Sequence, residues 1–366
     1  MSVEPPRIGL VGCGAISGAY LSHARHFPIL NIVACCDIDG EKSRAKADEF
    51  QIGRVLSVDE LLGDDEIEIV LNLTVPKAHA EISLAALNAG KHVYSEKPLA
   101  ITVAEGEKIL RVAREKNLRV GCAPDTFLGA GLQTARKVID DGAIGRPVAF
   151  TAFMMCPGHE HWHPNPQFFY ESGGGPMFDM GPYYLTALLN FFGPIRRISG
   201  AAAIAIPDRI ALDGRKIEVK TPDHICGSIE FQNGVLGSIV MSFATKFPQY
   251  ETQQPITIYG TDGTLKVPDP NVFDGPVHLR RRDEAEFQLV PHSFSAGYGR
   301  SVGLADMAAA LRSGRPHRAS GEQAYAVLEA MQGFLDSARN GCAIELKSTY
   351  ERPQPLNSAT DFSFTP

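Results

Sequence analysis

The chain carries, near its N-terminus, the stretch Ile8-Gly9-Leu10-Val11-Gly12-Cys13-Gly14-Ala15-Ile16-Ser17-Gly18. Its first four residues suit a short buried strand, and apolar side chains then recur at helical spacing, at Ile16, Tyr20, Ala24 and Phe27. Between them, the first two glycines of the turn permit a close approach of the backbone to an anion, which the N–H groups and dipole of the helix N-terminus attract. The stretch therefore predicts a strand–turn–helix unit that binds phosphate.

A second apolar run identifies the ligand that this unit would bind. Ile32 to Cys36 reads as a strand that ends in Asp37, which lies 19 residues beyond Gly18. An acidic residue at this place hydrogen-bonds the adenosine ribose of a dinucleotide and repels the 2′-phosphate of NADP. Ser17 replaces the usual third glycine, and its small side chain still permits close helix–strand packing. We therefore predict NAD binding at Gly12, Gly14 and Asp37, with a purely structural turn as the alternative.

Strands and helices then alternate. Strand-like runs cover Ile67–Leu73, Val93–Glu96 and Arg119–Ala123, and helix-like runs cover Ala78–Ala89 and Ala104–Lys116. Strict alternation is typical of a doubly wound parallel sheet with right-handed crossovers. The fold class is therefore predicted as α/β, with an N-terminal Rossmann domain over residues 1–125.

Beyond residue 125 the periodicity changes, and residues 126–366 are predicted to form an α+β domain with a large, mostly antiparallel open sheet. Asn233-Gly234 and Asp262-Gly263 each separate two strand-like runs, which is a strong signal for a β-hairpin. Helix-like runs at Leu132–Asp141, Tyr183–Phe192 and Glu322–Arg339 would cover one face of the sheet.

Composition limits the partners. The formal net charge is −7 and no long basic run occurs, so nucleic acid and anionic membranes are not expected to bind. No apolar stretch approaches the length of a membrane span. The 7 cysteines include no C-x-x-C pair, which favours reduced thiols and a cytoplasmic location.

The stretch His92-Val93-Tyr94-Ser95-Glu96-Lys97-Pro98 places a lysine at the end of a strand. The carboxyl ends of strands in an open α/β sheet border the crevice where ligands bind, so Lys97 is a candidate contact to both cofactor and substrate. The alternative is a surface lysine in a turn.

Together these features resemble the Gfo/Idh/MocA family, which comprises glucose-fructose oxidoreductase, inositol dehydrogenase and related sugar oxidoreductases. The resemblance spans nearly the whole chain, and it depends on five groups of residues: Gly12 to Ile16, Thr74 with His79, Ala89 to Pro98, Gly173-Gly174-Gly175, and Asp179 with Gly181. It implies a nicotinamide dinucleotide on the first domain, a sugar or cyclitol at the second, and a homodimer or homotetramer formed through the C-terminal sheet. It also implies that Ala15, Ile16, Thr74, His79, Glu96 and Lys97 contact the cofactor.

One departure from the family pattern bears on the mechanism. Many members read Asp-x-Gly-x-His after the glycines, with the histidine as acid/base, whereas this chain has Tyr183 at the position of that histidine. Members resembling glucose-fructose oxidoreductase also use a tyrosine there. A neighbouring ammonium such as Lys97 would favour the phenolate and so suit Tyr183 to general acid–base work. Alternatively, Tyr183 packs in the core. Asp179 would orient the substrate or the acid/base, cap the helix that Pro182 begins, or do both.

The stretch from Cys156 to Tyr170 contains the only tryptophan of the chain and a run of alternating histidines, His159, His161 and His163. The alternation suggests a metal site, but hydride transfer to a nicotinamide needs no metal when Tyr or Lys handles the proton, so we predict none. The favoured interpretation is a substrate loop in which Trp162 stacks on a sugar and His161, His163 and Asn165 bind hydroxyls. The alternative is a structural loop against a neighbouring subunit.

Asp125 follows the last strand of the first domain, where relatives often carry a basic residue, and a carboxylate there suits a neutral polyol. The sequence therefore predicts an NAD-dependent dehydrogenase of a small neutral sugar, which would form a lactone if the anomeric hydroxyl reacts, as with an apiose-type pentose. An inositol dehydrogenase and a keto-sugar reductase remain alternatives, as does a non-catalytic NAD-binding regulator.

Overall fold

The computed structural model describes residues 4–246, 254–294 and 297–357, which divide into two compact units. The first contains the described residues up to Gly129, the segment Gly297–Tyr325 and the stretch from Pro353. The second contains Ala130 to Ala296, as far as it is described, and Ala326–Arg352. The chain thus has the predicted combination of a parallel sheet and a large, mostly antiparallel sheet.

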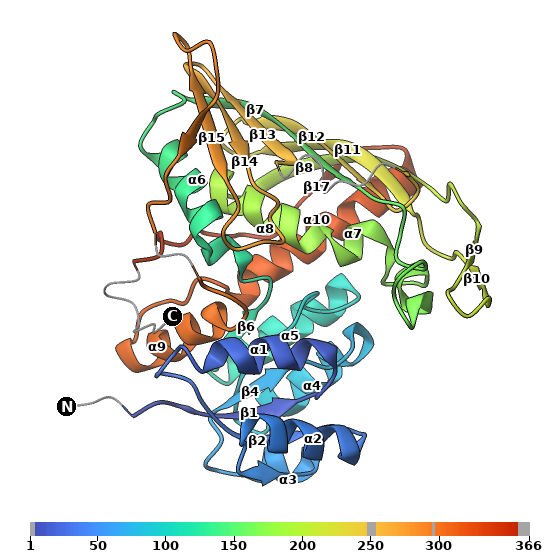
Figure 1. Cartoon of the computed structure of the whole chain (residues 1–366), viewed down its shortest axis with the longest axis vertical. Helices are drawn as coiled ribbons and strands as arrows, with labels where there is room; N and C mark the ends of the chain where they lie inside the picture. Colours follow the sequence, from blue (N-terminus) through green and yellow to red (C-terminus); the bar gives the residue numbers. More distant parts are fainter. Residues whose placement is uncertain (1–3, 247–253, 295–296, 358–366) are drawn as a thin grey trace. The chain divides into compact units, whose positions relative to one another are not determined.

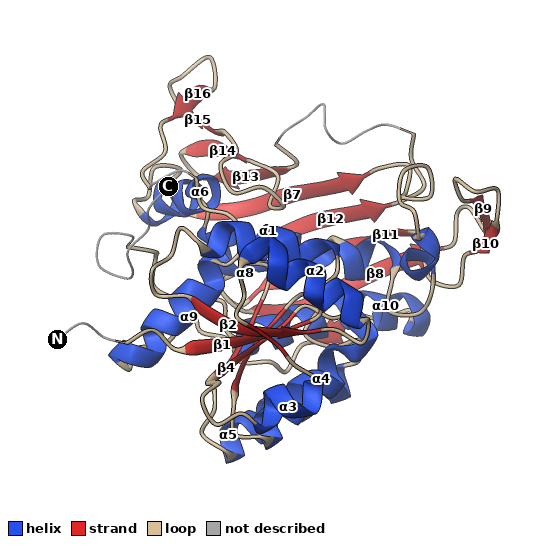
Figure 2. Ribbon diagram, turned by 60° about the horizontal axis from the view of Figure 1, so that its bottom comes forward, coloured by secondary structure: helices blue, strands red, loops and turns tan. Residues whose placement is uncertain are grey.

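The first unit is built on a six-stranded parallel sheet in the order β3-β2-β1-β4-β5-β6 (Figure 1). Its strands are β1 (Arg7–Val11), β2 (Asn31–Cys36), β3 (Arg54–Val55), β4 (Ile69–Asn72), β5 (His92–Ser95) and β6 (Val120–Cys122). Its helices are α1 (Ala15–Ala24), α2 (Gly40–Phe50), α3 (Val58–Gly63), α4 (Pro76–Asn88) and α5 (Val103–Glu115). Helices α1 and α2 lie on one face of the sheet, and α4 and α5 lie on the other (Figure 2). This is the predicted doubly wound arrangement.

Short-range signals in the sequence explain where several of these helices begin. Thr102 and Glu105 form a capping box at the start of α5, with the Thr102 hydroxyl accepting from the Glu105 N–H at 3.2 Å. Ser57 and Glu60 do the same for α3, which was not predicted. Asp39 caps α2 by accepting from the N–H of Glu41 at 3.1 Å.

A segment far along the chain completes the first unit. Helix α9 (Val302–Ser313) contacts β6, and Ser320 forms an antiparallel bridge with Gly121. The buried carboxylate of Asp306 accepts from the Arg318 backbone N–H at 2.7 Å and so fixes the chain beyond α9. A single boundary was predicted at 125/126, whereas the first unit extends to Gly129 and includes this later segment. Long-range packing determines which segments belong to the first unit. The local periodicity of the sequence does not indicate these contacts.

The second unit contains a nine-stranded sheet in the order β16-β15-β14-β13-β7-β12-β11-β8-β17, antiparallel except between β7 and β12 (Figure 2). Its strands are β7 (Pro147–Met155), β8 (Ile195–Ala203), β11 (His224–Phe231), β12 (Leu236–Ser242), β13 (Ile256–Gly260), β14 (Gly263–Val267), β15 (Val277–Arg281), β16 (Gln288–Val290) and β17 (Ile344–Glu345). The two predicted hairpins are confirmed as β11–β12 and β13–β14. Strands β9 (Asp208–Ile210) and β10 (Lys216–Glu218) form a separate hairpin.

Helices cover one face of the large sheet (Figure 1). They are α6 (Ala130–Asp140), α7 (Gly175–Asp179), α8 (Gly181–Phe192) and α10 (Gly321–Asn340), with a short 3-10 turn at Pro166–Tyr170. A second 3-10 turn, Thr126–Leu128, belongs to the first unit. Phe334 of α10 packs against two strand glycines, Gly200 and Gly227, where a Cβ would lie 3.0 and 2.7 Å from its ring. Every residue of α8 is buried. The core of this unit therefore lies between the sheet and α8, close to the predicted substrate residues.

Candidate active site

The predicted phosphate-binding turn forms between β1 and α1. Gly12 has φ +99°, and a Cβ on it would lie 2.7 Å from the backbone of Leu73, so no other residue fits there. Gly14 precedes α1, has no heavy atom within 4 Å of the position of a Cβ, and is exposed together with Ala15. Helix α1 begins without a side-chain cap, and N–H groups at such a helix N-terminus can bind an anion.

Asp37 lies at the end of β2, beside this turn. Its Oδ2 accepts the Cys13 N–H at 2.7 Å and its Oδ1 accepts the Asp39 N–H at 2.9 Å. These bonds orient the carboxylate and leave each oxygen a further lone pair for a ribose hydroxyl. The geometry suits the predicted role of Asp37 in cofactor choice.

A buried asparagine, which the sequence analysis missed, organises the turn after β4. The Asn72 amide donates to the His79 carbonyl at 3.0 Å, and its oxygen accepts the Thr74 hydroxyl at 2.7 Å. The His79 ring lies between the carbonyls of Pro98, at 2.7 Å, and Thr74, at 3.0 Å. Burial lowers the pKa of His79, and the hydrogen bonds to the two carbonyls partly offset this effect. The His79 ring therefore links the turn at Thr74 to Pro98, the residue that follows Lys97.

Glu96 and Lys97 follow β5, as predicted. One carboxylate oxygen of Glu96 accepts the Tyr20 hydroxyl and the other accepts the Lys97 backbone N–H, both at 2.8 Å. Glu96 is buried whereas Lys97 is half-buried. The buried carboxylate therefore fixes the backbone from which the Lys97 side chain extends.

Asp125 lies inside the first unit. Its side chain is fully buried, accepts the Gly303 N–H at 3.1 Å and lies 3.9 Å from the guanidinium of Arg300. Burial raises its pKa to about 6. The structure thus gives Asp125 a role in attaching the α9 segment, which the prediction of a substrate contact did not anticipate.

In the second unit, Asp179 and Tyr183 stand on either side of the α7–α8 junction. Asp179 ends α7, Tyr183 lies in the first turn of α8, and Met180 between them has helical backbone angles. Asp179 does not cap α8, since Met180 holds the N-cap position and no side-chain cap bond forms. Pro182 stands in the first turn of α8, as predicted.

Asp179 is bonded to a histidine that the predicted site omitted. Nε2 of His159 lies 3.1 Å from Oδ2 of Asp179. The His159 ring lies among Phe169 and Phe243, with ring centroids 4.3 and 4.6 Å away, and Trp162 at 5.3 Å. The alternation of His159, His161 and His163 was visible in the sequence, but nothing in it indicated which of them pairs with Asp179.

The predicted substrate residues of the same loop divide into exposed and packed side chains. His161 and Asn165 are exposed, and Trp162 is 54% exposed. Nδ1 of His163 accepts the Asn165 N–H at 3.0 Å, and its ring contacts the edges of Trp162 and Phe169. In the described part of the chain, no group of three or more His, Cys, Asp or Glu side chains could hold a metal ion.

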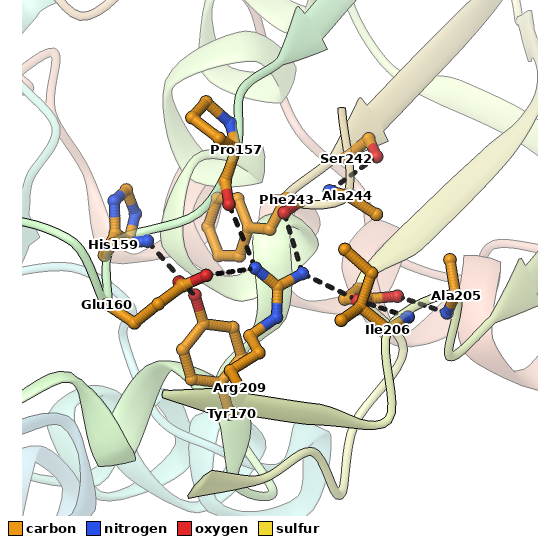
Figure 3. A network of polar contacts seen from close by, with 11 residues as sticks. Pro157, His159, Glu160, Tyr170, Ala205, Ile206, Arg209, Ser242, Phe243 and Ala244 are labelled. Carbon is orange, nitrogen blue, oxygen red and sulfur yellow. Dashed lines mark hydrogen bonds and ion pairs between the residues drawn. The ribbon is translucent and has the colours of Figure 1, made fainter. Parts of the chain in front are cut away.

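A buried arginine anchors this loop (Figure 3). Arg209, from β9, donates to the Pro157 carbonyl at 3.0 Å and to carboxylates of Glu160 and Asp223 at 2.8 Å each. Tyr170 donates to Glu160 and accepts the His159 N–H at 3.1 Å. Gly158 has φ +96°, and a Cβ there would lie 2.5 Å from Arg209. This network was not predicted, because nothing in the local sequence marks Arg209 as buried.

Comparisons with known proteins cover most of the chain. Residues 6–123 match a model described as an oxidoreductase family with an NAD-binding Rossmann fold, and residues 132–266 match the GFO/IDH/MocA C-terminal domain. The 1,5-anhydro-D-fructose reductase of Ensifer adhaerens is 28% identical over 93% of this chain and 99% of the relative. The D-apiose dehydrogenase of Paraburkholderia graminis is 24% identical over 93% of this chain and 89% of its own length.

Solved structures agree on the fold. A levoglucosan dehydrogenase in complex with NADH and L-sorbose superposes with a TM-score of 0.81 at 21% identity, covering 94% of this chain and 99% of that one. Among the described helices, none is both long and apolar enough to span a membrane. With its Rossmann turn, its open second sheet and both domain matches, the chain belongs to the Gfo/Idh/MocA family of NAD-binding oxidoreductases.

Proposed function

We propose that this protein is an NAD-dependent dehydrogenase of a small neutral sugar, which oxidises an aldose such as an apiose-type pentose at the anomeric carbon to a lactone. The proposal depends on one observation above all: Asp179 and Tyr183 share the α7–α8 junction, and Asp179 is bonded to His159 of the loop that exposes Trp162. A carboxylate, a phenol and an exposed indole together suit a polar substrate with a flat apolar face. The D-apiose and D-xylose dehydrogenases among the relatives support a pentose.

The first unit would hold the cofactor. Gly12, Gly14 and the N-terminus of α1, with Ala15 and Ile16, would receive the pyrophosphate, and Asp37 the adenosine ribose. Thr74 and Glu96 would shape the nicotinamide end beside Lys97. NAD, when bound, supplies the hydride acceptor, so the chain itself must manage the proton.

In the second unit, Tyr183 would take the proton of the reacting hydroxyl while Asp179 orients the hydroxyl or the phenol. Lys97 of the first unit would contribute a positive charge to the same reaction. Trp162 would stack on the sugar, and His161, His163 and Asn165 would bind its other hydroxyls. The loop thus selects the substrate, and the α7–α8 junction handles the proton.

A panel of sugars offered with NAD tests the function. An aldopentose such as apiose or xylose is expected to give NADH, and the product should hydrolyse to a sugar acid. Reduction of 1,5-anhydrofructose with NADH, and no oxidation of an aldose, would favour the reductase alternative, which the Ensifer adhaerens relative motivates. NADH formation from inositols alone would favour the cyclitol alternative. Tight NAD binding without turnover of any sugar would favour a regulator.

Cofactor choice is expected to depend on Asp37. The Asp37→Ala variant should bind NAD more weakly and show a smaller difference between NAD and NADP, because the carboxylate both holds the ribose diol and repels a 2′-phosphate. Fluorescence titration of both cofactors measures this. Asp39→Asn is the matched control, because asparagine also caps α2 while removing a neighbouring charge. If the wild type binds NADP more tightly than NAD, the assignment is wrong.

The second sheet has the properties of a subunit interface. Its uncovered face exposes apolar side chains, with Phe153 and Tyr259 each 42% exposed and Leu236 54% exposed. An exposed apolar patch of this kind often marks a subunit interface, which supports a homodimer or homotetramer. Sedimentation of the purified protein would give the number of subunits.

The seven cysteines, all in the described part of the chain, are free thiols, which supports a reducing cytoplasmic location.

A further inference from the structure

The strongest feature that the proposed mechanism leaves unexplained is the bond between His159 and Asp179. A carboxylate only accepts, so the hydrogen between Nε2 and Oδ2, 3.1 Å apart, belongs to the imidazole. Both side chains are mostly buried, with 13% and 18% of their surface exposed, so the pair is partly shielded from water. A hydrogen bond to a carboxylate in such surroundings is worth more than one at the surface.

His159 is held at both ends. Its backbone N–H donates to the Tyr170 hydroxyl at 3.1 Å, and Tyr170 in turn donates to Glu160, which is paired with Arg209. Its ring is packed by Phe169 and Phe243. Neither the loop nor the ring can therefore turn easily, and Nε2–H points at Asp179 before any substrate arrives.

We propose that His159 is a positioning residue for the proposed sugar oxidation: it fixes the carboxylate of Asp179 so that Asp179 is already oriented toward the reacting hydroxyl or Tyr183. The catalytic part of this inference rests on the proposed function. The pairing of His159 with Asp179 rests on the geometry alone. An aspartate side chain has two rotatable bonds, and the hydrogen bond from His159 restricts rotation about both. The Arg209 network is the outer support of the same arrangement.

The bond also determines the tautomer of His159. With Nε2 protonated toward Asp179, Nδ1 of a neutral ring is left as an acceptor. The described residues provide no hydrogen-bond partner for Nδ1. A substrate hydroxyl or water near Nδ1 would therefore have to donate to it.

Two substitutions separate this role from packing. His159→Phe keeps an aromatic ring between Phe169 and Phe243 and removes the donor, and kcat is expected to fall about 10- to 100-fold, the factor of a lost hydrogen bond to a charged group. His159→Gln places an amide N–H near the position of Nε2 and should restore most of the loss. His292→Phe is the control, since His292 lies outside the site and makes one ring hydrogen bond, to the Gly275 carbonyl at 3.0 Å.

A double-mutant cycle tests whether His159 acts through Asp179. On an Asp179→Asn background, His159→Phe should lower kcat little further. The proposal fails if the losses in kcat from His159→Phe and Asp179→Asn multiply in the double variant. It also fails if His159→Phe raises the sugar KM and leaves kcat unchanged, because His159 would then be an independent substrate contact. Thermal unfolding of each variant checks that the fold is intact.

A measurement without turnover separates this inference from the proposed function. Nitrogen-15 NMR of the histidine rings should show His159 as the Nε2–H tautomer in the wild type, and Asp179→Asn should change that signal. An Nδ1–H tautomer, or a signal insensitive to Asp179→Asn, overturns the pairing whatever the activity. An enzyme that shows the predicted tautomer and oxidises no sugar would instead disprove the proposed function.

Discussion

Replacing Lys97 with methionine is expected to lower kcat by at least about 10²-fold, the lower end of what general acid–base catalysis contributes. Methionine keeps much of the length of the side chain and removes both the ammonium charge and a hydrogen-bond donor. Because the backbone of Lys97 is held by Glu96 and does not depend on the ammonium, the variant should fold normally. NAD should also bind more weakly, since Lys97 is proposed to lie beside the nicotinamide ribose. Stopped-flow turnover and cofactor titration measure the two effects.

Two further variants test whether the effect is specific to the Lys97 side chain. Lys116→Met removes an exposed lysine at the end of α5 and should change neither quantity. Tyr183→Phe should reproduce the fall in kcat, by about 10²–10⁴-fold, while leaving NAD binding intact, because it removes only the proton carrier. A Lys97→Met enzyme with nearly full turnover, when chemistry limits the rate, would show that the positive charge is not needed.

Replacing Arg209 with methionine is expected to cost about 3–5 kcal/mol of unfolding free energy, because removing one member of a buried ion pair leaves the other charge uncompensated. The side chains of Arg209 and Asp223 are 1% and 0% exposed, and four hydrogen bonds from the guanidinium would be lost. Urea unfolding measures the change. Arg215→Met is the matched control on the same hairpin, since its pair with Asp213 is exposed and should contribute little to stability. Equal effects in the two variants would contradict the role of the buried network.

The Arg209 network should also make stability depend on pH. Burial alone would raise the pKa of Glu160, but the hydroxyl of Tyr170 and the guanidinium of Arg209 together hold it below its ordinary value. A carboxyl with a lowered pKa in the folded state contributes stability above its unfolded pKa of about 4.3 and loses it as the pH falls. Acidification below that value should therefore destabilise the wild type more than Arg209→Met.

The parts of the structure that could be predicted are those determined by residues that lie close together in the sequence. Glycine turns, and the change from helical to alternating periodicity along the sequence, identified both sheets and most helices. The turn around Gly12 and Asp37 has the expected geometry, whereas the contacts of the first unit with a cofactor stay a prediction.

What was missed depends on contacts between distant residues. His159 is bonded to Asp179, 20 residues on, and Arg209 joins groups 14 to 52 residues away. Asp125 was read as a substrate contact from its position after a strand, but it is buried against Gly303, 178 residues later. Charged residues are exposed by default, so a buried one is recognised only when its partners are known.

The late return of the chain to the first unit has a consequence for protein synthesis. The Rossmann sheet is translated by Gly129, yet its helix α9 lies beyond Gly297. At about 5–20 residues per second, a ribosome needs roughly 10–30 s to reach it. Until then, β6 lacks the helix that contacts it, and the carboxylate of Asp125 lacks the Gly303 N–H. The nascent first unit therefore stays incomplete while the whole second sheet is being made, and a fragment ending near residue 129 should need a chaperone to remain in solution.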